Sequence, residues 1–529
     1  MNGTAVPLST NGRPGVHKFR TQRNHYVFDV NTGRIIKLDP ATWDVLDHYG
    51  RLDAENLARL LAPRHSPEAV RSSCEAIAKA QAQGSLLPSP AALTWPDDAA
   101  QREAQEAVEH KRHLLTLCAT EACNLRCTYC IYGGSYDGWP VHSGRKMPWD
   151  VARRAIDDYI EHSDGHAAED ELGSRYIGFY GGEPLLNMAL IHRVVAYGRK
   201  RLGRKVAFNL TTNGLRLRGA AARFLAQEQI DLTISLDGPQ HLHDACRRSA
   251  GGKGTWRTVI GNVRRFLQEH PRYRDTEPGL SPLTFAAVLP PMRNALEVEQ
   301  FLRDDLPELL GCHPTIIVRR QRPGSRRETS IACQDRTATG WATLRQRYLR
   351  MVQEGAVGKD PRGYEWRFPR SAFDVPLRLF VHRRIGSGRS PLPAKAMWNS
   401  LCMPGHTRMF VDVEGGYYPC ERVPTCRDLR IGGVDEGLRF DLAYGLKKKL
   451  WELCSRDCPG CWCVNFCHPG CYENIRDGDR MSAAAKGRCC EQHRQRTHEL
   501  LVGFCEVAEE NPAAFDYLKT DQRPDTHGD

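Results

Sequence analysis

The sequence predicts an α/β fold built around a parallel sheet or partial barrel, preceded by a small winged-helix-like unit and followed by a cysteine-rich region. From His113 onward, strand-like runs alternate with helix-like runs, a pattern typical of parallel sheets with functional residues at the carboxyl ends of the strands. The 529 residues suggest three or so domains of roughly 100–200 residues each. The chain contains 20 cysteines, most of them in two regions, which indicates metal binding rather than disulfides in a chain of this size.

Composition restricts the class of protein. Hydrophobic residues make up 41% of the chain and charged residues 26%, as in ordinary globular proteins. The first residues are polar and lack the apolar core of a signal peptide. No apolar run approaches the roughly 18 residues of a membrane span. We therefore expect a cytoplasmic protein with no membrane partner.

The net charge of +11 is a weak argument for nucleic-acid binding, because it counts every cysteine as neutral. An iron–sulfur cluster with four thiolates carries a charge of about −2, so several clusters would offset part of the excess. The basic residues are also dispersed, and we expect no nucleic-acid partner. The one dense patch, RRQRPGSRR at 319–327, predicts a solvated loop, with contact to an acidic peptide as the alternative.

Residues 17–87 predict the winged-helix-like unit. Two short β-type runs, at 25–30 and 34–39, surround Asn31-Thr32-Gly33, which is a hairpin signal. Three helix-like stretches follow, with proline or glycine at their ends. Residues 88–112 are rich in proline, alanine and charge, which predicts a partly helical linker.

Residues 113–320 predict the α/β core. Its strand-like runs are HLLTLCAT, RYIGFY, KVAFNLTTNG, DLTISLDG, LTFAAVL and PTIIVRR. We divide the rest into a bridging region at 321–400, a cysteine-rich region at 401–492 with little regular structure, and a C-terminal helix and tail at 493–529.

Three cysteines follow the first predicted strand as Cys123-x3-Cys127-x2-Cys130. Three thiolates in one loop can hold three corners of a cubane cluster and leave the fourth iron open, whereas a zinc site would require a fourth ligand. The segment resembles the radical S-adenosylmethionine (SAM) superfamily, whose signature is C-x3-C-x-Φ-C, with Tyr129 in the aromatic place. The resemblance implies a partial (β/α)6 TIM-like barrel that binds SAM and holds a catalytic [4Fe–4S] cluster on Cys123, Cys127 and Cys130.

The motif Gly181-Gly182-Glu183-Pro184 follows the second predicted strand. Alone it is compatible with an ordinary strand-to-helix turn. The resemblance implies that this turn binds the SAM amino group through backbone oxygens and the acid. It also places Ser235 and Asp237 near SAM, with Asn213 as a neighbour and Arg247 within reach of the SAM carboxylate.

Two other patterns are not interpreted as sites. GGKGTW at 251–256 lacks the Lys-Ser/Thr pair of a phosphate-binding loop. His241 and His243 have no third ligand at helical spacing, and we expect both on the surface. Cys118 is outside the three-cysteine pattern and is expected to be inert.

The cysteines after residue 400 follow a second pattern. Cys402-x12-Gly415-x4-Cys420 is followed by Cys458-x2-Cys461-x5-Cys467-x3-Cys471 and then by Cys489 or Cys490. This pattern resembles the SPASM domain, an extension with two auxiliary [4Fe–4S] clusters; a zinc ribbon is the alternative. The resemblance assigns auxiliary cluster I to Cys402, Cys420 and Cys471. It assigns auxiliary cluster II to Cys458, Cys461, Cys467 and one of the last pair, with Cys489 preferred.

One departure concerns the fourth ligand of auxiliary cluster I. Some relatives supply it from between the first two cysteines, and this sequence has no cysteine there. Cys426, Cys454, Cys463 or Cys490 could fill the place. Alternatively, the iron stays open and binds a substrate thiolate.

The unit at 17–87 resembles the PqqD-like RiPP recognition element, the leader-binding domain of ribosomal peptide maturases. The matching segments are YVFDVNTGRIIKLDPATWDVL and the helices after it. The resemblance implies that an extended leader peptide adds to the edge strand of the hairpin. A generic winged helix that binds DNA is the alternative, but the unit lacks a dense basic recognition helix.

Together, these resemblances imply a radical SAM/SPASM peptide maturase. Its expected partners are a ribosomally synthesised precursor peptide and an external electron donor of the flavodoxin or ferredoxin type. The expected reaction is an intramolecular cross-link, with a cysteine thioether preferred over a carbon–carbon or carbon–nitrogen macrocycle. Formylglycine formation, as in anaerobic sulfatase maturation, is a further alternative. An electron carrier or metal-stabilised adaptor would not explain the SAM-binding motifs.

Overall fold

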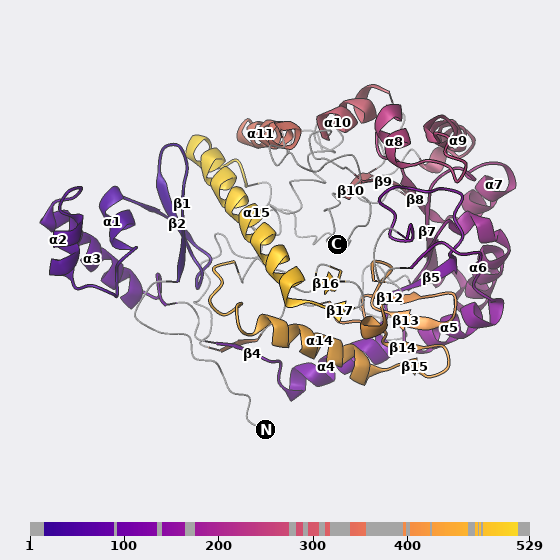
Figure 1. The fold of residues 1–529 in the computed structure, drawn as a ribbon, viewed down its shortest axis with the longest axis horizontal. Helices are drawn as coiled ribbons and strands as arrows, with labels where there is room; N and C mark the ends of the chain where they lie inside the picture. Colours follow the sequence, from indigo (N-terminus) through magenta and orange to yellow (C-terminus); the bar gives the residue numbers. More distant parts are fainter. Residues whose placement is uncertain are drawn as a thin grey trace.

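The computed structural model places a small N-terminal unit at one end of the molecule and a larger α/β body at the other, with the long helix α15 (Ala483–Glu510) between them (Figure 1). The structure describes residues 15–88, 92–134, 140–163, 175–273, 282–288, 295–305, 313–317, 339–355, 395–397, 402–423, 426–463, 471–473, 475–477 and 480–516. The basic patch at 319–327 and Cys467 lie outside these residues.

The N-terminal unit is a three-stranded antiparallel sheet, ordered β1-β2-β3, with three helices. Its elements are β1 (Val16–Arg20), β2 (His25–Asp29), β3 (Ile35–Leu38), α1 (Pro40–Val45), α2 (Ala54–Leu61) and α3 (Pro67–Ala82). Asp39, Asp53 and Ser66 precede the three helices. The side chain of each accepts a hydrogen bond from a backbone N–H in the first turn of the helix that follows. The hairpin and the helices confirm the prediction, but β1 was missed because only Phe19 of that strand is buried.

The predicted linker is partly structured. The helix α4 (Asp98–His110) confirms its helical part. The strand β4 (Ala92–Thr94) pairs in parallel with β11 (Lys395–Met397). This pairing was not predicted, because the partner strand lies in the bridging region, far along the chain.

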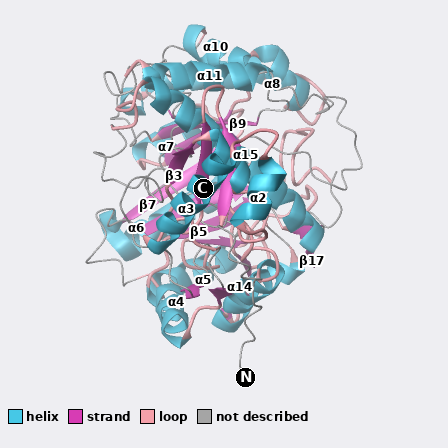
Figure 2. Ribbon diagram, turned by 90° about the vertical axis from the view of Figure 1, so that its left-hand side faces the viewer, coloured by secondary structure: helices cyan, strands magenta, loops and turns pink. Residues whose placement is uncertain are grey.

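Six parallel strands in chain order confirm the predicted α/β core. They are β5 (Leu114–Thr120), β6 (Arg175–Gly181), β7 (Val206–Thr212), β8 (Asp231–Ser235), β9 (Leu283–Val288) and β10 (His313–Ile317). The intervening helices are α5 (Trp149–Glu161), α6 (Met188–Leu202), α7 (Gly219–Gln227), α8 (Gln240–Cys246), α9 (Trp256–Glu269) and α10 (Ala295–Asp304). The helices surround the strands (Figure 2). Because the strands are parallel, their carboxyl ends meet at one edge, where the motif residues lie.

The cysteine-rich region continues the same sheet. The strand β12 (Arg408–Val411) pairs in parallel with β5, and three short antiparallel strands extend the sheet beyond it. These are β13 (Gly416–Tyr418), β14 (Gly432–Gly433) and β15 (Gly437–Leu438). The helix α14 (Phe440–Cys454) follows and buries Ala443, Leu446 and Leu450. The expectation of little regular structure here was therefore wrong.

The C-terminal helix is longer than predicted. The helix α15 (Ala483–Glu510) begins after the capping residue Ser482, so Cys489 and Cys490 are helical. It contacts β1 of the N-terminal unit and α11 (Thr339–Gln353). The remaining short elements are β16 (Arg476–Asp477), β17 (Arg480–Met481) and the 3-10 turns η2 (Pro184–Asn187), η3 (Gly203–Lys205), η4 (Pro271–Tyr273) and η8 (Arg427–Leu429).

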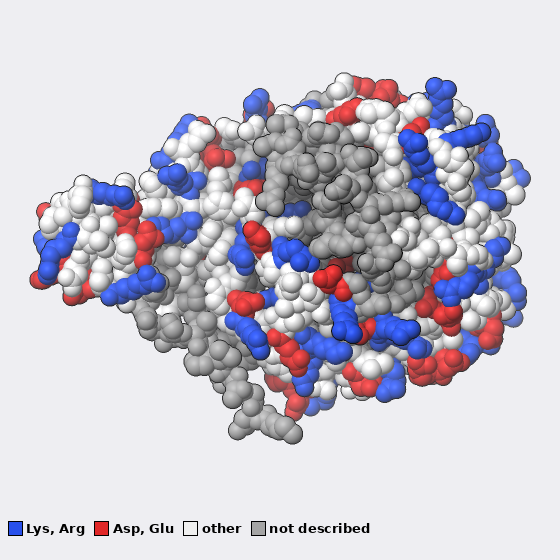
Figure 3. All heavy atoms as spheres, viewed as in Figure 1, with Lys and Arg blue, Asp and Glu red and all other residues white. Residues whose placement is uncertain are grey.

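Acidic and basic side chains are interspersed over the face shown in Figure 3, in line with the dispersed charge of the sequence. In the described part of the chain, no helix combines the length and apolar character needed to cross a bilayer.

Candidate functional site

The three-cysteine loop follows β5 and is held against the segment after α8. The backbone N–H of Arg126 donates to the carbonyl of Arg248 at 2.8 Å, and that of Thr128 donates to Cys246 at 3.0 Å. The N–H of Ala250 donates back to the carbonyl of Asn124 at 2.9 Å. These main-chain hydrogen bonds fix the loop that carries the cysteines.

A buried carboxylate secures the start of the loop. Glu121 is 2% exposed and accepts hydrogen bonds from Arg145 Nε and Nη2, both at 2.8 Å, and from Ser143 Oγ at 2.5 Å. The Glu121 N–H donates to the Arg145 carbonyl at 3.0 Å. Pairing with Arg145 compensates the cost of burying this charge.

The thiols of Cys123, Cys127 and Cys130 lie close enough together to interact electrostatically. Burial raises the pKa of Cys123 to about 11, with further contributions from Glu183 and Cys130. Burial also raises the pKa of Cys127 to about 12, with contributions from the other two thiols. Because the thiolate is the metal-binding form, a bound metal would stabilise it in this group.

His142 lies beside the Cys130 thiol and was missed in the sequence. Its Nε2 is 3.8 Å from Cys130 Sγ, and its Nδ1 is 3.1 Å from the Glu121 carbonyl oxygen. Burial lowers the pKa of His142. No motif spacing links this histidine to the cysteines, so only the fold identifies it.

The Gly181–Pro184 turn packs against the beginning of the cysteine loop. The Gly182 N–H donates to the Thr120 carbonyl at 2.8 Å, and the Glu183 N–H donates to the Ala122 carbonyl at 2.9 Å. A Cβ atom on Gly182 would lie 2.2 Å from the Ala122 oxygen. The turn therefore requires glycine for a close backbone approach.

Glu183 joins the ends of β6 and β7. It is 1% exposed, and its carboxylate accepts from Thr212 Oγ1 at 2.7 Å, the Asn213 N–H at 2.8 Å and the Leu185 N–H at 3.2 Å. Burial raises its pKa, against these hydrogen bonds. The carboxylate that the resemblance assigns to SAM is thus also a structural connection between neighbouring strands.

Asn213 then connects β7 to the cysteine loop. Its Nδ2 donates to Asn124 Oδ1 at 2.8 Å and lies 3.8 Å from Cys123 Sγ. The structure therefore brings Asn213, Glu183 and Cys123 into one continuous group.

Asp237 organises the next part of the site. Its carboxylate accepts from Tyr129 Oη, from Arg247 Nε at 2.8 Å and from the Val288 N–H at 2.9 Å. The Arg247 guanidinium also lies 5.3 Å from the centre of the Tyr129 ring. Three predicted site residues therefore form one buried network, while Ser235 lies half-buried at the end of β8.

His243 corrects one expectation. It is fully buried, whereas His241 is exposed and pairs with Glu297 at 2.8 Å. The ring of His243 lies between the Asp237 N–H, at 3.4 Å from Nδ1, and Thr255 Oγ1, at 3.1 Å from Nε2. It was wrongly placed on the surface because the short helix α8 shows too little periodicity to identify its inner face.

Cys402, Cys420 and Cys471 come together although they are far apart in sequence. Desolvation and, to a smaller extent, the charge of Cys471 together raise the pKa of Cys402 to about 11. Burial raises the pKa of Cys420 well above its usual range, with contributions from Glu421 and both other cysteines. The three predicted ligands of auxiliary cluster I thus form one group.

The second C-terminal group contains Cys454, Cys458, Cys461 and Cys490. The thiols of Cys454 and Cys458 are hydrogen-bonded to each other. Cys490 interacts electrostatically with both Cys458 and Cys461. This placement favours Cys490 over Cys489 as the partner of the predicted cluster II ligands.

Within the described residues, no three His, Cys, Asp or Glu side chains are arranged around a single metal ion. A cubane binds each thiolate at a different iron, so its ligands stand farther apart than those of one ion. Two buried polar atoms near Cys402, Tyr472 Oη and Glu421 Oε2, have no hydrogen-bond partner in this part of the structure. These unpartnered atoms fit a site that holds an additional polar group.

Residues 117–294 match the Radical SAM superfamily model. These residues form a radical SAM domain. The cofactors of radical SAM domains are SAM and a [4Fe–4S] cluster, and Cys123, Cys127 and Cys130 lie within the matched residues.

Curated relatives of the radical SAM domain include two sulfatase-maturating enzymes. The cysteine-type anaerobic sulfatase-maturating enzyme of Clostridium perfringens (strain 13 / Type A) is 30% identical over 149 residues, 28% of this chain and 38% of the relative. The serine-type enzyme of Klebsiella aerogenes is 30% identical over 163 residues, 30% of this chain and 37% of the relative. The matched stretch thus spans little more than a third of each relative.

Among solved structures, hexahistidine-tagged anSMEcpe with bound AdoMet has a similar fold. The match has a TM-score of 0.52 and 17% identity, and it covers 77% of this chain and 99% of that one. At 17% identity, this match shows a similar fold and nothing about activity.

Proposed function

We propose that this chain is a radical SAM enzyme that modifies a ribosomally synthesised precursor peptide, installing a cross-link whose preferred form is a cysteine thioether. The observation that carries the proposal is the combination of a radical SAM domain with an N-terminal unit that presents an unpaired sheet edge. An unpaired edge can bind an extended peptide by strand addition, through main-chain hydrogen bonds.

The edge in question is β3. In the sheet order β1-β2-β3, it has a strand neighbour on one side only among the described residues. Ile35, Ile36 and Leu38 are half-buried, and Lys37 is exposed. The strand therefore offers both backbone groups and apolar side chains to a leader peptide.

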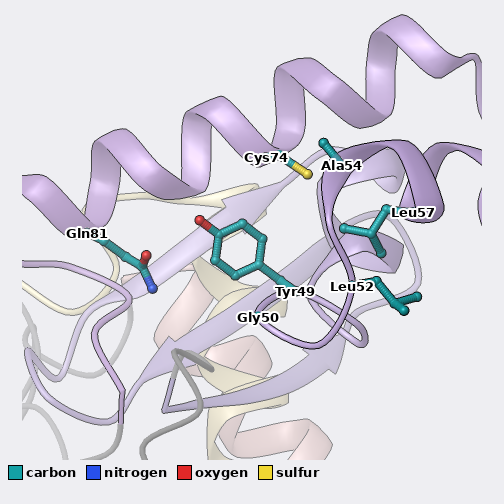
Figure 4. A pocket seen from close by; sticks show the side chains of 7 residues that line it. All are labelled: Tyr49, Gly50, Leu52, Ala54, Leu57, Cys74 and Gln81. Carbon is teal, nitrogen blue, oxygen red and sulfur yellow. The ribbon is translucent and has the colours of Figure 1, made fainter.

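A cavity in the same unit supports a side-chain anchor. It has a volume of about 360 Å³ and lies between the turn after α1, the helix α2 and the helix α3 (Figure 4). The residues that line it are Tyr49, Gly50, Leu52, Ala54, Leu57, Cys74 and Gln81. A mainly apolar cavity of this size suits an aliphatic or aromatic side chain.

The β1–β2 hairpin is attached to the body. Glu509 on α15 accepts hydrogen bonds from Thr21 Oγ1 at 2.7 Å, Asn24 Nδ2 at 2.9 Å and Tyr26 Oη at 2.8 Å. His17 on β1 stacks on Trp462, with 3.5 Å between ring centres. These contacts hold the unit through β1 and β2 and leave the other edge, β3, for the leader.

When bound, the cluster and SAM supply a 5′-deoxyadenosyl radical that removes a carbon-bound hydrogen atom from the substrate. The chain's own residues hold the site in place. Asp237 fixes Tyr129 and Arg247, and Glu183 fixes the end of β7 through Thr212. Formation of a thioether also releases the thiol proton and one electron.

We assign the C-terminal cysteines to two auxiliary [4Fe–4S] clusters, which would supply an acceptor for this electron. An external flavodoxin- or ferredoxin-type donor would supply the electron that starts each turnover. The grouping of Cys402 with Cys420 and Cys471 supports cluster I. The grouping of Cys458 with Cys461 and Cys490 supports cluster II.

A second candidate is formylglycine formation, favoured by the names of the two curated relatives. The structure of anSMEcpe with bound AdoMet and Kp18Cys peptide, with a TM-score of 0.51 and 17% identity, shows a peptide bound on a similar fold. Mass spectrometry of the peptide after coexpression separates the two reactions. A thioether removes two hydrogen atoms per link and leaves the peptide thiol unreactive toward alkylation, whereas formylglycine introduces an aldehyde.

The leader-binding proposal is tested by Lys37→Pro, with Lys37→Ala as the matched control. Proline removes a backbone N–H from the β3 edge, so the leader should bind at least about tenfold more weakly, which corresponds to about 1.4 kcal/mol. Affinity is measured by fluorescence anisotropy of a labelled leader with the full-length chain. Peptide-independent SAM cleavage should be unchanged in both variants. Equal leader affinity in the two variants would contradict strand addition at β3.

A further inference from the structure

Glu421 follows Cys420 directly in the chain, and its charge acts on Cys402 and Cys420 of the group that also contains Cys471. Its side chain is 16% exposed, and one oxygen, Oε1, lies 3.3 Å from Arg408 Nη1. The other, Oε2, is buried and has no hydrogen-bond partner within the described residues. The negative charge of Glu421 contributes to raising the pKa of both Cys402 and Cys420. A buried carboxylate oxygen without a partner is costly unless a further group binds it.

A second unpartnered atom lies at the same place. Tyr472 is 3% exposed, and its hydroxyl has no hydrogen-bond partner among the described residues. Burial raises its pKa well above the usual range, and the charges of Cys402 and Cys471 contribute. Two orphaned polar atoms around three thiols indicate that the group is complete only with an additional occupant.

The charges around this group fit a cluster with one carboxylate ligand. Three thiolates and one carboxylate on a [4Fe–4S] cluster give a net charge of about −2 in the oxidised state. Two guanidinium groups lie nearby. Arg408 pairs with Glu421. Burial would lower the pKa of Arg422, but the charges of Glu473, Glu421, Cys471 and Cys420 raise it. The two positive charges therefore lie beside the carboxylates of Glu421 and Glu473 and the thiols of this group.

The cysteines considered for the fourth position have other neighbours. Cys454 is hydrogen-bonded to Cys458, and Cys463 donates to Thr497 Oγ1 at 3.3 Å. Cys490 interacts with Cys458 and Cys461. Cys426 is fully buried and contributes to the electrostatics of Tyr418.

We propose that Glu421 is the fourth protein ligand of auxiliary cluster I, through Oε2. The assignment rests on the proposed auxiliary cluster and names a ligand that the cysteine pattern does not contain. Iron–sulfur clusters prefer soft thiolate ligands, so the carboxylate is the ligand of this set that a substrate thiolate displaces most easily. Without peptide, the Glu421 carboxylate would cover the fourth iron. With peptide bound, this iron would be available to the substrate thiolate.

The test uses the full chain with Cys123, Cys127 and Cys130 replaced by alanine, so that auxiliary clusters alone contribute iron. In ⁵⁷Fe Mössbauer spectra, an iron with an oxygen ligand has a larger isomer shift than one with four sulfur ligands. We expect about one-eighth of the iron in two clusters to show this larger shift. Glu421→Ala should remove that component, and Glu421→Cys should convert it to an all-sulfur component while the iron content is retained. Arg408→Gln, which removes the ion pair but leaves the carboxylate, should keep it.

The alternatives are distinguishable. Iron content near that of two clusters with a spectrum unchanged by Glu421→Ala would overturn the ligand assignment and leave the auxiliary clusters intact. Loss of cluster I in Glu421→Ala without recovery in Glu421→Cys would also overturn it, provided circular dichroism shows that both variants fold. Absence of iron from the triple-alanine chain itself would overturn the auxiliary clusters and the ligand together.

Discussion

The two cysteine regions are built in different ways. Cys123, Cys127 and Cys130 lie within one loop after one strand, and main-chain hydrogen bonds to residues 246–250 fix that loop. The C-terminal cysteines come from the segment before β12, the end of β13, the end of α14 and the start of α15. The first set needs little loop closure, whereas the second must bring distant segments together at a larger entropic cost. A local ligand set can therefore be identified by its spacing, and a distributed set depends on the fold.

The largest effect that tests this comparison is expected on SAM cleavage, when the three cysteines of the loop are replaced. Replacing Cys123, Cys127 and Cys130 by alanine should reduce SAM cleavage to the level of a protein-free control, because the cluster would lose all its protein ligands. Formation of 5′-deoxyadenosine under anaerobic reducing conditions is the measurement. Cys118→Ala is the matched control, since Cys118 is buried on β5, and it should retain activity. Activity in the triple variant would remove the basis of the assignment.

Among the C-terminal cysteines, the variants Cys490→Ala and Cys489→Ala should differ in iron content. Cys490 interacts with Cys458 and Cys461, so its loss should lower the iron content by about 4 atoms per chain, one cluster. Cys489→Ala, one position away on the same helix, should keep its iron. Iron analysis after anaerobic reconstitution is the measurement. The reverse result would support the preference for Cys489 that the sequence spacing gave.

The packing around the three-cysteine loop can be tested without cofactors. Asp237→Asn should lower the free energy of unfolding by about 3–5 kcal/mol, because it leaves Arg247 buried without its counter-charge. Asp237 is 3% exposed and Arg247 is 7% exposed. Urea unfolding of the cluster-free chain is the measurement. Asp441→Ala removes the exposed pair with Arg439 and should have no measurable effect. Equal stability of the two variants would show that the Asp237 network contributes little to holding the loop.

The smallest expected effect is a pH dependence from His243. Burial and, to a smaller extent, the charge of Arg247 together lower its pKa to about 4, while an unfolded histidine has a pKa of about 6.5. The unfolded chain therefore binds more protons between these values, and the free energy of unfolding should fall by up to about 3 kcal/mol as pH decreases from about 6.5 to 4. His243→Gln should remove this part of the dependence, and His241→Gln should not.

The comparison of His243→Gln with His241→Gln also separates the effect of His243 on pH-dependent stability from that of Asp231. Burial raises the pKa of Asp231 to about 6, so its protonation favours the folded state as pH decreases and opposes the histidine effect. Both variants retain Asp231, so their difference reports on His243 alone. Identical pH profiles for His243→Gln and His241→Gln would mean that the buried ring does not control this dependence.

Much of the core could be predicted because its signals are local. Six strand-like runs separated by helix-like runs correspond to β5–β10. The spacing of Cys123 to Cys130 and the glycines of the Gly181–Pro184 turn also marked two segments that pack together, since a Cβ atom on Gly182 would clash with the Ala122 backbone. The strand β1 and helix α14 were missed, because burial against distant segments determines them more than their own periodicity.

The sequence by itself determined the α/β core, the three-cysteine loop and the glycine turn beside it, because each depends on residues that are neighbours in the chain. The tertiary structure alone decided that His243 is buried, that His142 approaches Cys130, and that Cys490 lies near Cys458 and Cys461. It also decided the surroundings of Glu421 Oε2. These features depend on which distant side chains remove water from a polar group, and spacing along one chain does not contain that information.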